Sequence, residues 1–175
     1  MKTTPLFYAA ALALLACIPL QADNLLKNPE LELNDKGNAP KNWKTYSSIQ
    51  KISTDEKEAP SGSKESLRVD IVADGGNALG QILQKLPVKA KTDYVFRMDI
   101  KSSVSGIGLG QIKLMSLRSE LERLPTKTSS KKWITVELEF NSGNADNVLV
   151  ILRYKQKADQ EGETIWFANP VLTEK

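Results

Sequence analysis

The chain has 175 residues, with 24 basic and 21 acidic side chains and a formal net charge of +3. This length suffices for one domain with a substantial core. The charges are interspersed and form no basic block, so we expect a solvated surface and no nucleic-acid partner. The sequence contains no histidine. That absence excludes Ser-His-Asp and Cys-His catalysis and removes the commonest ligand of catalytic zinc.

Residues 1–22 are typical of a secretory signal peptide. Lys2 supplies the positive charge, residues 6–20 are apolar, and Leu20-Gln21-Ala22 ends in a small residue at a suitable cleavage point. The apolar stretch is about 15 residues long, shorter than the roughly 20 that a transmembrane helix needs. No second stretch could span a bilayer. We therefore predict a protein without a transmembrane segment, secreted, periplasmic or in the cell envelope.

Cys17 leaves an alternative open. Leu14-Leu15-Ala16-Cys17 resembles the lipobox of bacterial lipoproteins, in which the cysteine is lipidated and anchors the mature chain. The other interpretation is a small apolar residue inside the signal peptide. If cleavage follows Ala22, residues 23–175 have no cysteine, and therefore no disulfide, thiolate metal ligand or thiol nucleophile. We predict that residues 23–175 form a single domain.

The remaining sequence has a dominant period of two. In residues 92–101, for example, apolar and charged side chains alternate, as in a strand with one buried face. Residues 119–124 could form one helical turn at most. Short strands separated by turns rich in Asn, Gly and Pro predict an all-β sandwich or barrel. In chain order, strands are expected at residues 25–33 and 45–52 (the weakest patterns), 67–72, 78–85, 92–101, 107–118, 133–140, 147–155 and 164–173.

Several short motifs follow one another in a characteristic order. They are Asn24-Leu25, Asn28-Pro29, Leu31-Glu32, Pro40-Lys41-Asn42-Trp43, Tyr94-Val95-Phe96, Lys101-Ser102, Trp133 and Trp166-Phe167-Ala168-Asn169-Pro170-Val171-Leu172. Their order and spacing resemble carbohydrate-binding modules of the family-4/9 type. The resemblance covers nearly all of residues 23–175. It implies an antiparallel jelly-roll β-sandwich of the galactose-binding-like kind, with a poly- or oligosaccharide as the ligand.

The same resemblance implies a structural calcium ion, held in this fold by oxygen ligands from an early Glu and a late Asp. Glu32 matches the Glu, but Ala168 stands where the family usually has Asp. We therefore predict no cofactor and no metal site, with a structural calcium ion as the alternative.

Proteins bind sugars by stacking aromatic side chains on the rings and by hydrogen bonding the hydroxyls. Most aromatic residues here belong to predicted core positions, and Tyr46 is the one expected to be exposed. If their strands lie side by side in one sheet, polar residues on the outward faces would form a groove, in which the two arginines could make forked hydrogen bonds. The alternative is that they are surface residues in mutual ion pairs. The predicted ligand-binding residues are Tyr46, Gln81, Arg97, Asp99, Gln111 and Arg153.

Three functions are compatible with these sequence features. The first is a secreted, non-catalytic carbohydrate-binding module, expected to be monomeric. The alternative is an extracellular or envelope β-sandwich that binds a protein partner, which the small number of aromatic residues favours. The third is a glycosidase or lyase, because Glu137 and Glu139 lie about 7 Å apart on one strand face and glycosidases use carboxylate pairs. Alternating glutamates are common on exposed strands, so we predict no catalytic residues and no enzyme.

Overall fold

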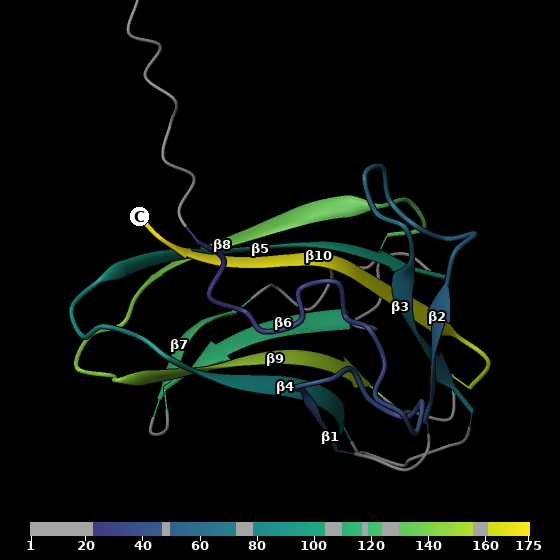
Figure 1. Cartoon of the computed structure of the whole chain (residues 1–175), viewed down its shortest axis with the longest axis horizontal. Helices are drawn as coiled ribbons and strands as arrows, with labels where there is room; N and C mark the ends of the chain where they lie inside the picture. Colours follow the sequence, from purple (N-terminus) through teal and green to yellow (C-terminus); the bar gives the residue numbers. More distant parts are fainter. Residues whose placement is uncertain are drawn as a thin grey trace, which may run out of the picture.

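The computed structural model describes residues 23–46, 50–72, 79–103, 110–116, 119–123, 130–155 and 161–175. In these residues the chain forms β-strands and no helix, so no described helix could cross a membrane. Two five-stranded antiparallel sheets pack face to face (Figure 1), which confirms the predicted all-β sandwich. The predicted signal peptide and Cys17 lie outside the described residues.

Each sheet combines strands from distant parts of the sequence. The first sheet contains, in spatial order, β1 (Lys44–Tyr46), β4 (Leu79–Pro87), β9 (Asn147–Lys155), β6 (Gly110–Met115) and β7 (Glu120–Arg123). The second sheet contains β2 (Gln50–Asp55), β3 (Ser66–Ile71), β10 (Thr164–Glu174), β5 (Asp93–Ser102) and β8 (Ile134–Asn141). Their inward side chains meet between the layers.

Three of the expected elements differ from the structure. Residues 25–33 form no strand, because Asn28 and Leu31 have positive φ angles of 55° and 60° and turn the backbone. Residues 45–52 contribute to two strands, β1 and β2, instead of one. Residues 119–124, for which one helical turn was the most expected, contain the edge strand β7 at Glu120–Arg123, which pairs with β6.

The core follows the alternation of the strands. On β5, Phe96, Met98 and Ile100 are each at most 3% exposed and point between the sheets. Tyr94 stacks on Phe140 of β8 with 5.6 Å between the ring centroids. Trp43, expected in the core, is buried as well. Large apolar side chains of both sheets therefore form one buried cluster.

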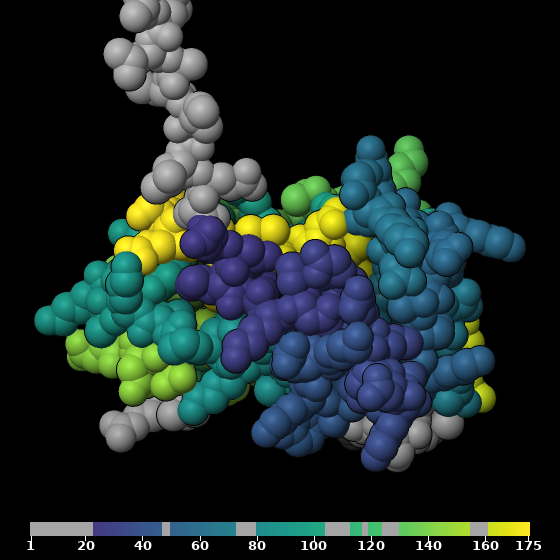
Figure 2. Space-filling model, in the orientation of Figure 1, coloured from purple at the N-terminus to yellow at the C-terminus, as the bar shows by residue number. Residues whose placement is uncertain are grey.

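The segment before β1 closes one side of the sandwich. Figure 2 shows these N-terminal residues spread between β10 and β4. The backbone N–H of Leu25 donates to the carbonyl oxygen of Leu172 on β10, at 2.8 Å. On the other side, the buried Gln84 of β4 accepts from the N–H of Lys27 and donates to its carbonyl oxygen, both at 2.8 Å. The segment therefore joins the two sheets.

The asparagines of the first motifs satisfy backbone groups. Asn24 accepts a hydrogen bond from the N–H of Leu172 and donates to the carbonyl oxygen of Pro170, both at 3.0 Å. Asn28 donates to the carbonyl oxygens of Glu32 and Lys41, each at 3.0 Å. These motif residues therefore hold the fold together, since buried or half-buried backbone groups need partners.

Candidate functional site

The structure divides the six predicted ligand-binding residues between two surfaces. We call the outward surface of the β1-β4-β9-β6-β7 sheet the β9 face, and that of the β2-β3-β10-β5-β8 sheet the β5 face. The β9 face receives Tyr46, Gln81, Gln111 and Arg153, whereas Arg97 and Asp99 belong to β5. The two faces lie on opposite sides of the sandwich, so the expectation of one groove that contains both arginines was wrong.

On the β9 face, four predicted residues form one row across four strands. Tyr46 of β1 lies opposite Gln81 of β4, and Gln81 lies opposite Arg153 of β9. Arg153 in turn lies opposite Gln111 of β6. Directly paired residues project to the same side of a sheet. The neighbouring Ile82 and Leu152 are fully buried in the core, so this row points outward.

The row has an exposed aromatic residue at one end. Tyr46 is 54% exposed, and it is the aromatic residue that the sequence predicted to be accessible. Gln81 and Arg153 are partly exposed, and the register gives the position of Gln111. Adjacent strands are about 4.8 Å apart, so the row is about 14 Å long. The phenol of Tyr46, the amide of Gln81 and the guanidinium of Arg153 thus follow a line that the register extends to position 111, long enough for a short oligosaccharide.

An aliphatic surface lies next to this row. Leu83 of β4 is paired with Ile151 of β9, and both point outward. Ile151 is only 4% exposed although it faces away from the core. In the following row, Leu149 lies opposite Met115 of β6. Sequence periodicity did not predict this surface, and its only signal is the nearly continuous apolar character of residues 147–155.

Basic side chains surround the aliphatic residues. Lys44 and Lys85 are exposed at one side of the β9 face. On the other side, Lys113 and Arg123 both form ion pairs with Glu120. The hydrogen bond from Lys113 holds the pKa of Glu120 below its ordinary value, which keeps that carboxylate ionised. Glu120 therefore offsets one of these positive charges.

Arg153 lies at the centre of the row without an acidic partner among the described residues. Its Nε is buried and has no hydrogen-bond partner there. A buried, unpaired N–H group on a charged side chain costs free energy in the unliganded protein. Nε itself is covered, but the Arg153 side chain is partly exposed, so the outer part of its guanidinium can reach a ligand on this face.

On the β5 face, Arg97 and Asp99 are already engaged. Arg97 forms an ion pair with Glu137 of β8. Asp99 accepts hydrogen bonds from Thr135, at 2.5 Å, and from Asn169, at 2.8 Å. These contacts match the alternative interpretation of Arg97 as a surface residue in an ion pair.

The two glutamates weighed as a catalytic pair also lie on the β5 face. Glu137 is paired with Arg97, and Glu139 is paired with Lys175. All four side chains are largely exposed. This arrangement has neither the buried carboxylic acid nor the unpaired nucleophile that glycosidases use. We see no catalytic geometry in this pair.

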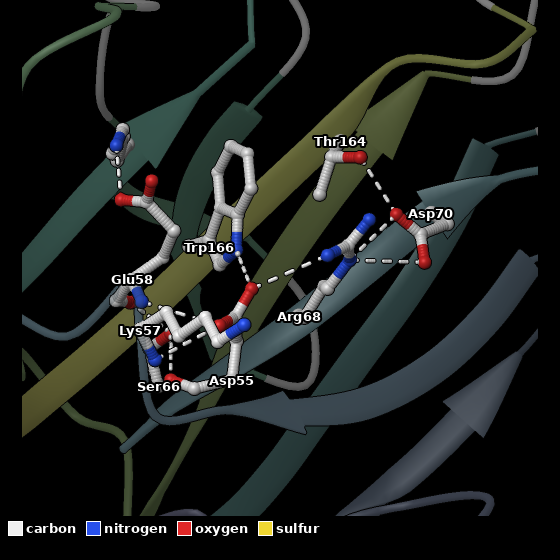
Figure 3. A network of polar contacts seen from close by, with 9 residues as sticks. Asp55, Lys57, Glu58, Ser66, Arg68, Asp70, Thr164 and Trp166 are labelled. Atoms are coloured by element: carbon white, nitrogen blue, oxygen red, sulfur yellow. Dashed lines mark hydrogen bonds and ion pairs between the residues drawn. The ribbon is translucent and has the colours of Figure 1, made fainter. Parts of the chain in front are cut away.

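A second polar cluster on the β5 face surrounds Trp166 of β10 (Figure 3). The indole faces outward but is only 8% exposed, because Arg68 and Lys101 lie over its ring at 5.8 Å and 5.2 Å from the centroid. Its N–H donates to Asp55 at 3.1 Å. Asp70 accepts from Arg68 at 2.9 Å. The ring is thus covered by the protein's own cations and does not offer a stacking surface to a sugar.

The residues implied for calcium do not fit a metal ion. The carboxylate of Glu32 lies 3.3 Å from the ammonium of Lys41. Ala168 is buried and offers no side-chain oxygen. Within the described residues, no group of three or more His, Cys, Asp or Glu side chains could hold a metal ion. The absence of a cofactor remains a prediction.

The chain matches known proteins in three-dimensional structure but not in sequence. No protein-family model matches the sequence. A search of curated proteins finds no match either.

Several solved structures share the fold. A carbohydrate-binding module, TmCBM61, solved with beta-1,4-galactotriose, is 12% identical with a TM-score of 0.65 over 88% of this chain and 100% of that chain. The Stig cyclase Fisc from Fischerella sp. TAU is 15% identical, with a TM-score of 0.68 over 89% of this chain and 98% of that chain. The arabinofuranosidase MgGH51, solved with arabinose, is 19% identical with a TM-score of 0.61 over 87% of this chain, which spans only 26% of that enzyme.

These similarities establish the fold. Modules of families 4 and 16 are among the other structures that match. The chain is therefore a jelly-roll β-sandwich of the kind found in carbohydrate-binding modules, and the same fold occurs in a cyclase. A shared fold does not define a ligand. The finer assignment to the family-4/9 type remains a prediction from the sequence motifs.

Proposed function

We propose that this protein is a non-catalytic carbohydrate-binding module that acts outside the cytoplasm and binds an oligo- or polysaccharide on the β9 face. The observation that carries the proposal is the row formed by Tyr46, Gln81, Arg153 and Gln111. The row offers a stacking ring at one end and hydrogen-bonding groups along the rest of its length. Leu83 and Leu149 beside it are partly exposed and would contact the apolar faces of sugar rings.

Two further facts support this proposal. TmCBM61 was solved with a bound trisaccharide, and it matches this chain over the full length of that module. The opposite face of the sandwich is less suitable, because its arginine and its tryptophan are occupied by intramolecular contacts. The β9 face is thus the surface with polar groups that remain available.

The test is a glycan array probed with the purified protein and with a Tyr46→Ala variant. We expect the wild type to bind a defined set of glycans and the variant to bind the same set about fivefold more weakly, since one stacked ring contributes on the order of 1 kcal/mol. The unfolding midpoint of the variant should match that of the wild type, because Tyr46 is exposed. Binding that is unchanged in Tyr46→Ala would contradict the proposed face.

The alternative is that the β9 face binds a protein partner. The partly exposed aliphatic residues Leu83 and Leu149 are the feature that would favour it. In that case the array would show no glycan above background. Cross-linking from position 46 would instead capture a protein.

A further inference from the structure

The β9 face also indicates which class of sugar it accepts. We infer, resting on the proposed function, that its ligand carries carboxylate groups, as uronic-acid oligosaccharides do, and that Arg153 binds one of these carboxylates. Three features point to this ligand: the positive charge of the face, the lack of an acidic partner for Arg153 among the described residues, and the central position of Arg153 in the row.

The outward side chains of this face are strongly basic. Five cations project from it, and Glu120 is the single carboxylate that faces them among the described outward side chains. Such a surface attracts anions and repels cations. A neutral glycan would gain nothing from this charge. The five cations are Lys44, Lys85, Lys113, Arg123 and Arg153.

Two of these five cations are paired with a carboxylate of the protein itself. Glu120 holds Lys113 and Arg123 at the β7 edge. Lys44 and Lys85 are exposed and flank the row of Leu83 at the other side. Arg153 is the central cation, and it has no acidic partner in the described part of the chain. A ligand that crosses the strands would therefore meet an unneutralised charge midway along its length.

Arginine suits a carboxylate better than a hydroxyl at this point. Its planar guanidinium can donate two parallel hydrogen bonds to the two oxygens of a carboxylate. The amide of Gln81 lies on the neighbouring strand, directly opposite, where it can hydrogen bond a ring hydroxyl of the same sugar.

The experiment compares each charged ligand with its neutral counterpart. The probes are hexamers of α-1,4-linked galacturonate and of β-1,4-linked mannuronate, each with a carboxyl-reduced form that differs only in the loss of charge. Affinities are measured by isothermal titration for the wild type, Arg153→Gln and Arg97→Gln. The last variant removes a matched cation from the β5 face and serves as the control.

For the wild type, we expect at least one uronate hexamer to bind about tenfold more tightly than its reduced form. Arg153→Gln should remove this preference, because it weakens binding of the uronate hexamer more than binding of the reduced hexamer. Arg97→Gln should keep it. Raising the salt concentration from about 0.05 to about 0.5 M should weaken binding of the uronate form alone, because the charges become screened.

Three results would overturn the inference. Equal affinity for charged and reduced hexamers would reject the uronate preference and leave the proposed sugar-binding function intact. A preference that survives in Arg153→Gln but disappears in Arg97→Gln would move the site to the β5 face. Failure of all four hexamers to bind would reject the uronate ligand, and failure of the glycan array as well would reject the proposed function.

Discussion

The side-chain oxygen of Asn24 accepts a hydrogen bond from the backbone N–H of Leu172, at 3.0 Å, although 148 residues separate them. The same amide donates to the carbonyl oxygen of Pro170. The first and last sequence motifs therefore meet in space, and an amide side chain joins them. In this chain Asn24 therefore serves the fold, by joining the N-terminal segment to β10.

Replacement of Asn24 by Ala should lower the free energy of unfolding by about 1–3 kcal/mol, because it leaves half-buried backbone groups of β10 without partners. Urea unfolding followed by tryptophan fluorescence measures this change. Asn38→Ala is the control, since the Asn38 side chain makes only an exposed hydrogen bond to Asn34. Equal stability of the two variants would show that Asn24 does not join the segment to β10.

Gln81 and Gln84 lie on the same strand and face opposite ways, so one substitution separates stability from binding. Gln84→Leu removes three hydrogen bonds, to Lys27 and Asn42, and should cost about 1–3 kcal/mol of stability. Gln81→Leu should change stability by less than about 0.5 kcal/mol but weaken glycan binding. Unfolding and glycan binding are measured in parallel for both variants. If Gln81→Leu were the less stable of the two, the assignment of Gln84 to stability and Gln81 to binding would be contradicted.

Two fully buried tyrosines offer a second matched pair. The hydroxyl of Tyr94 accepts a hydrogen bond from the N–H of Lys89 at 2.9 Å. The hydroxyl of Tyr154 has no partner in the described residues, and burial raises its pKa above the ordinary value. Tyr94→Phe should therefore lose about 1 kcal/mol, whereas Tyr154→Phe should lose nothing or gain stability. Thermal unfolding of both variants measures the two changes in stability. A larger loss of stability in Tyr154→Phe than in Tyr94→Phe would contradict the prediction.

Asp55 should contribute to the pH dependence of stability. Burial raises its pKa, but hydrogen bonds from Trp166, from the backbone of Glu58 and Lys57, and from Arg68 together lower it below the ordinary value of 3.8. The folded protein therefore protonates Asp55 at a lower pH than the unfolded chain does. The stability that Asp55 supplies is present above 3.8 and is lost as the pH falls through the folded-state value.

Trp166→Phe tests this coupling, because it keeps a ring beneath Arg68 and Lys101 but removes the N–H donor. The pKa of Asp55 should rise in this variant, and the loss of stability in acid should become smaller. Carboxyl NMR titration and unfolding curves between about pH 2 and about pH 6 measure the two effects. Trp43→Phe is the control, since the indole N–H of Trp43 has no described partner. An unshifted Asp55 pKa in Trp166→Phe would reject the coupling.

Sequence periodicity predicted most of the strands, because each has one face in the core and one in solvent. It failed where local backbone geometry decided the outcome, as at Asn28 and Leu31. It also failed at β7, a short, charged edge strand that depends on pairing with β6. Neither a residue with a positive φ angle nor a strand that depends on pairing with its neighbour leaves a periodic pattern in the sequence.

The candidate site was predicted in part. Alternation identified Gln81 and Arg153 as outward residues, and the structure places them opposite one another. Alternation cannot say which sheet a strand joins, so Arg97 was grouped with them incorrectly. The aliphatic residue Ile151 was missed because an outward apolar side chain in a central strand resembles a core residue in sequence.

The most direct test of the central claim compares matched double variants on the two faces. Gln81→Leu with Arg153→Gln alters the β9 face, and Arg97→Gln with Asp99→Asn alters the β5 face. Affinity electrophoresis in gels that contain a polysaccharide identified by the glycan array measures retention of each. The account predicts that the first variant loses retention and the second keeps it. Retention lost only in the second variant, or equally in both, would contradict it.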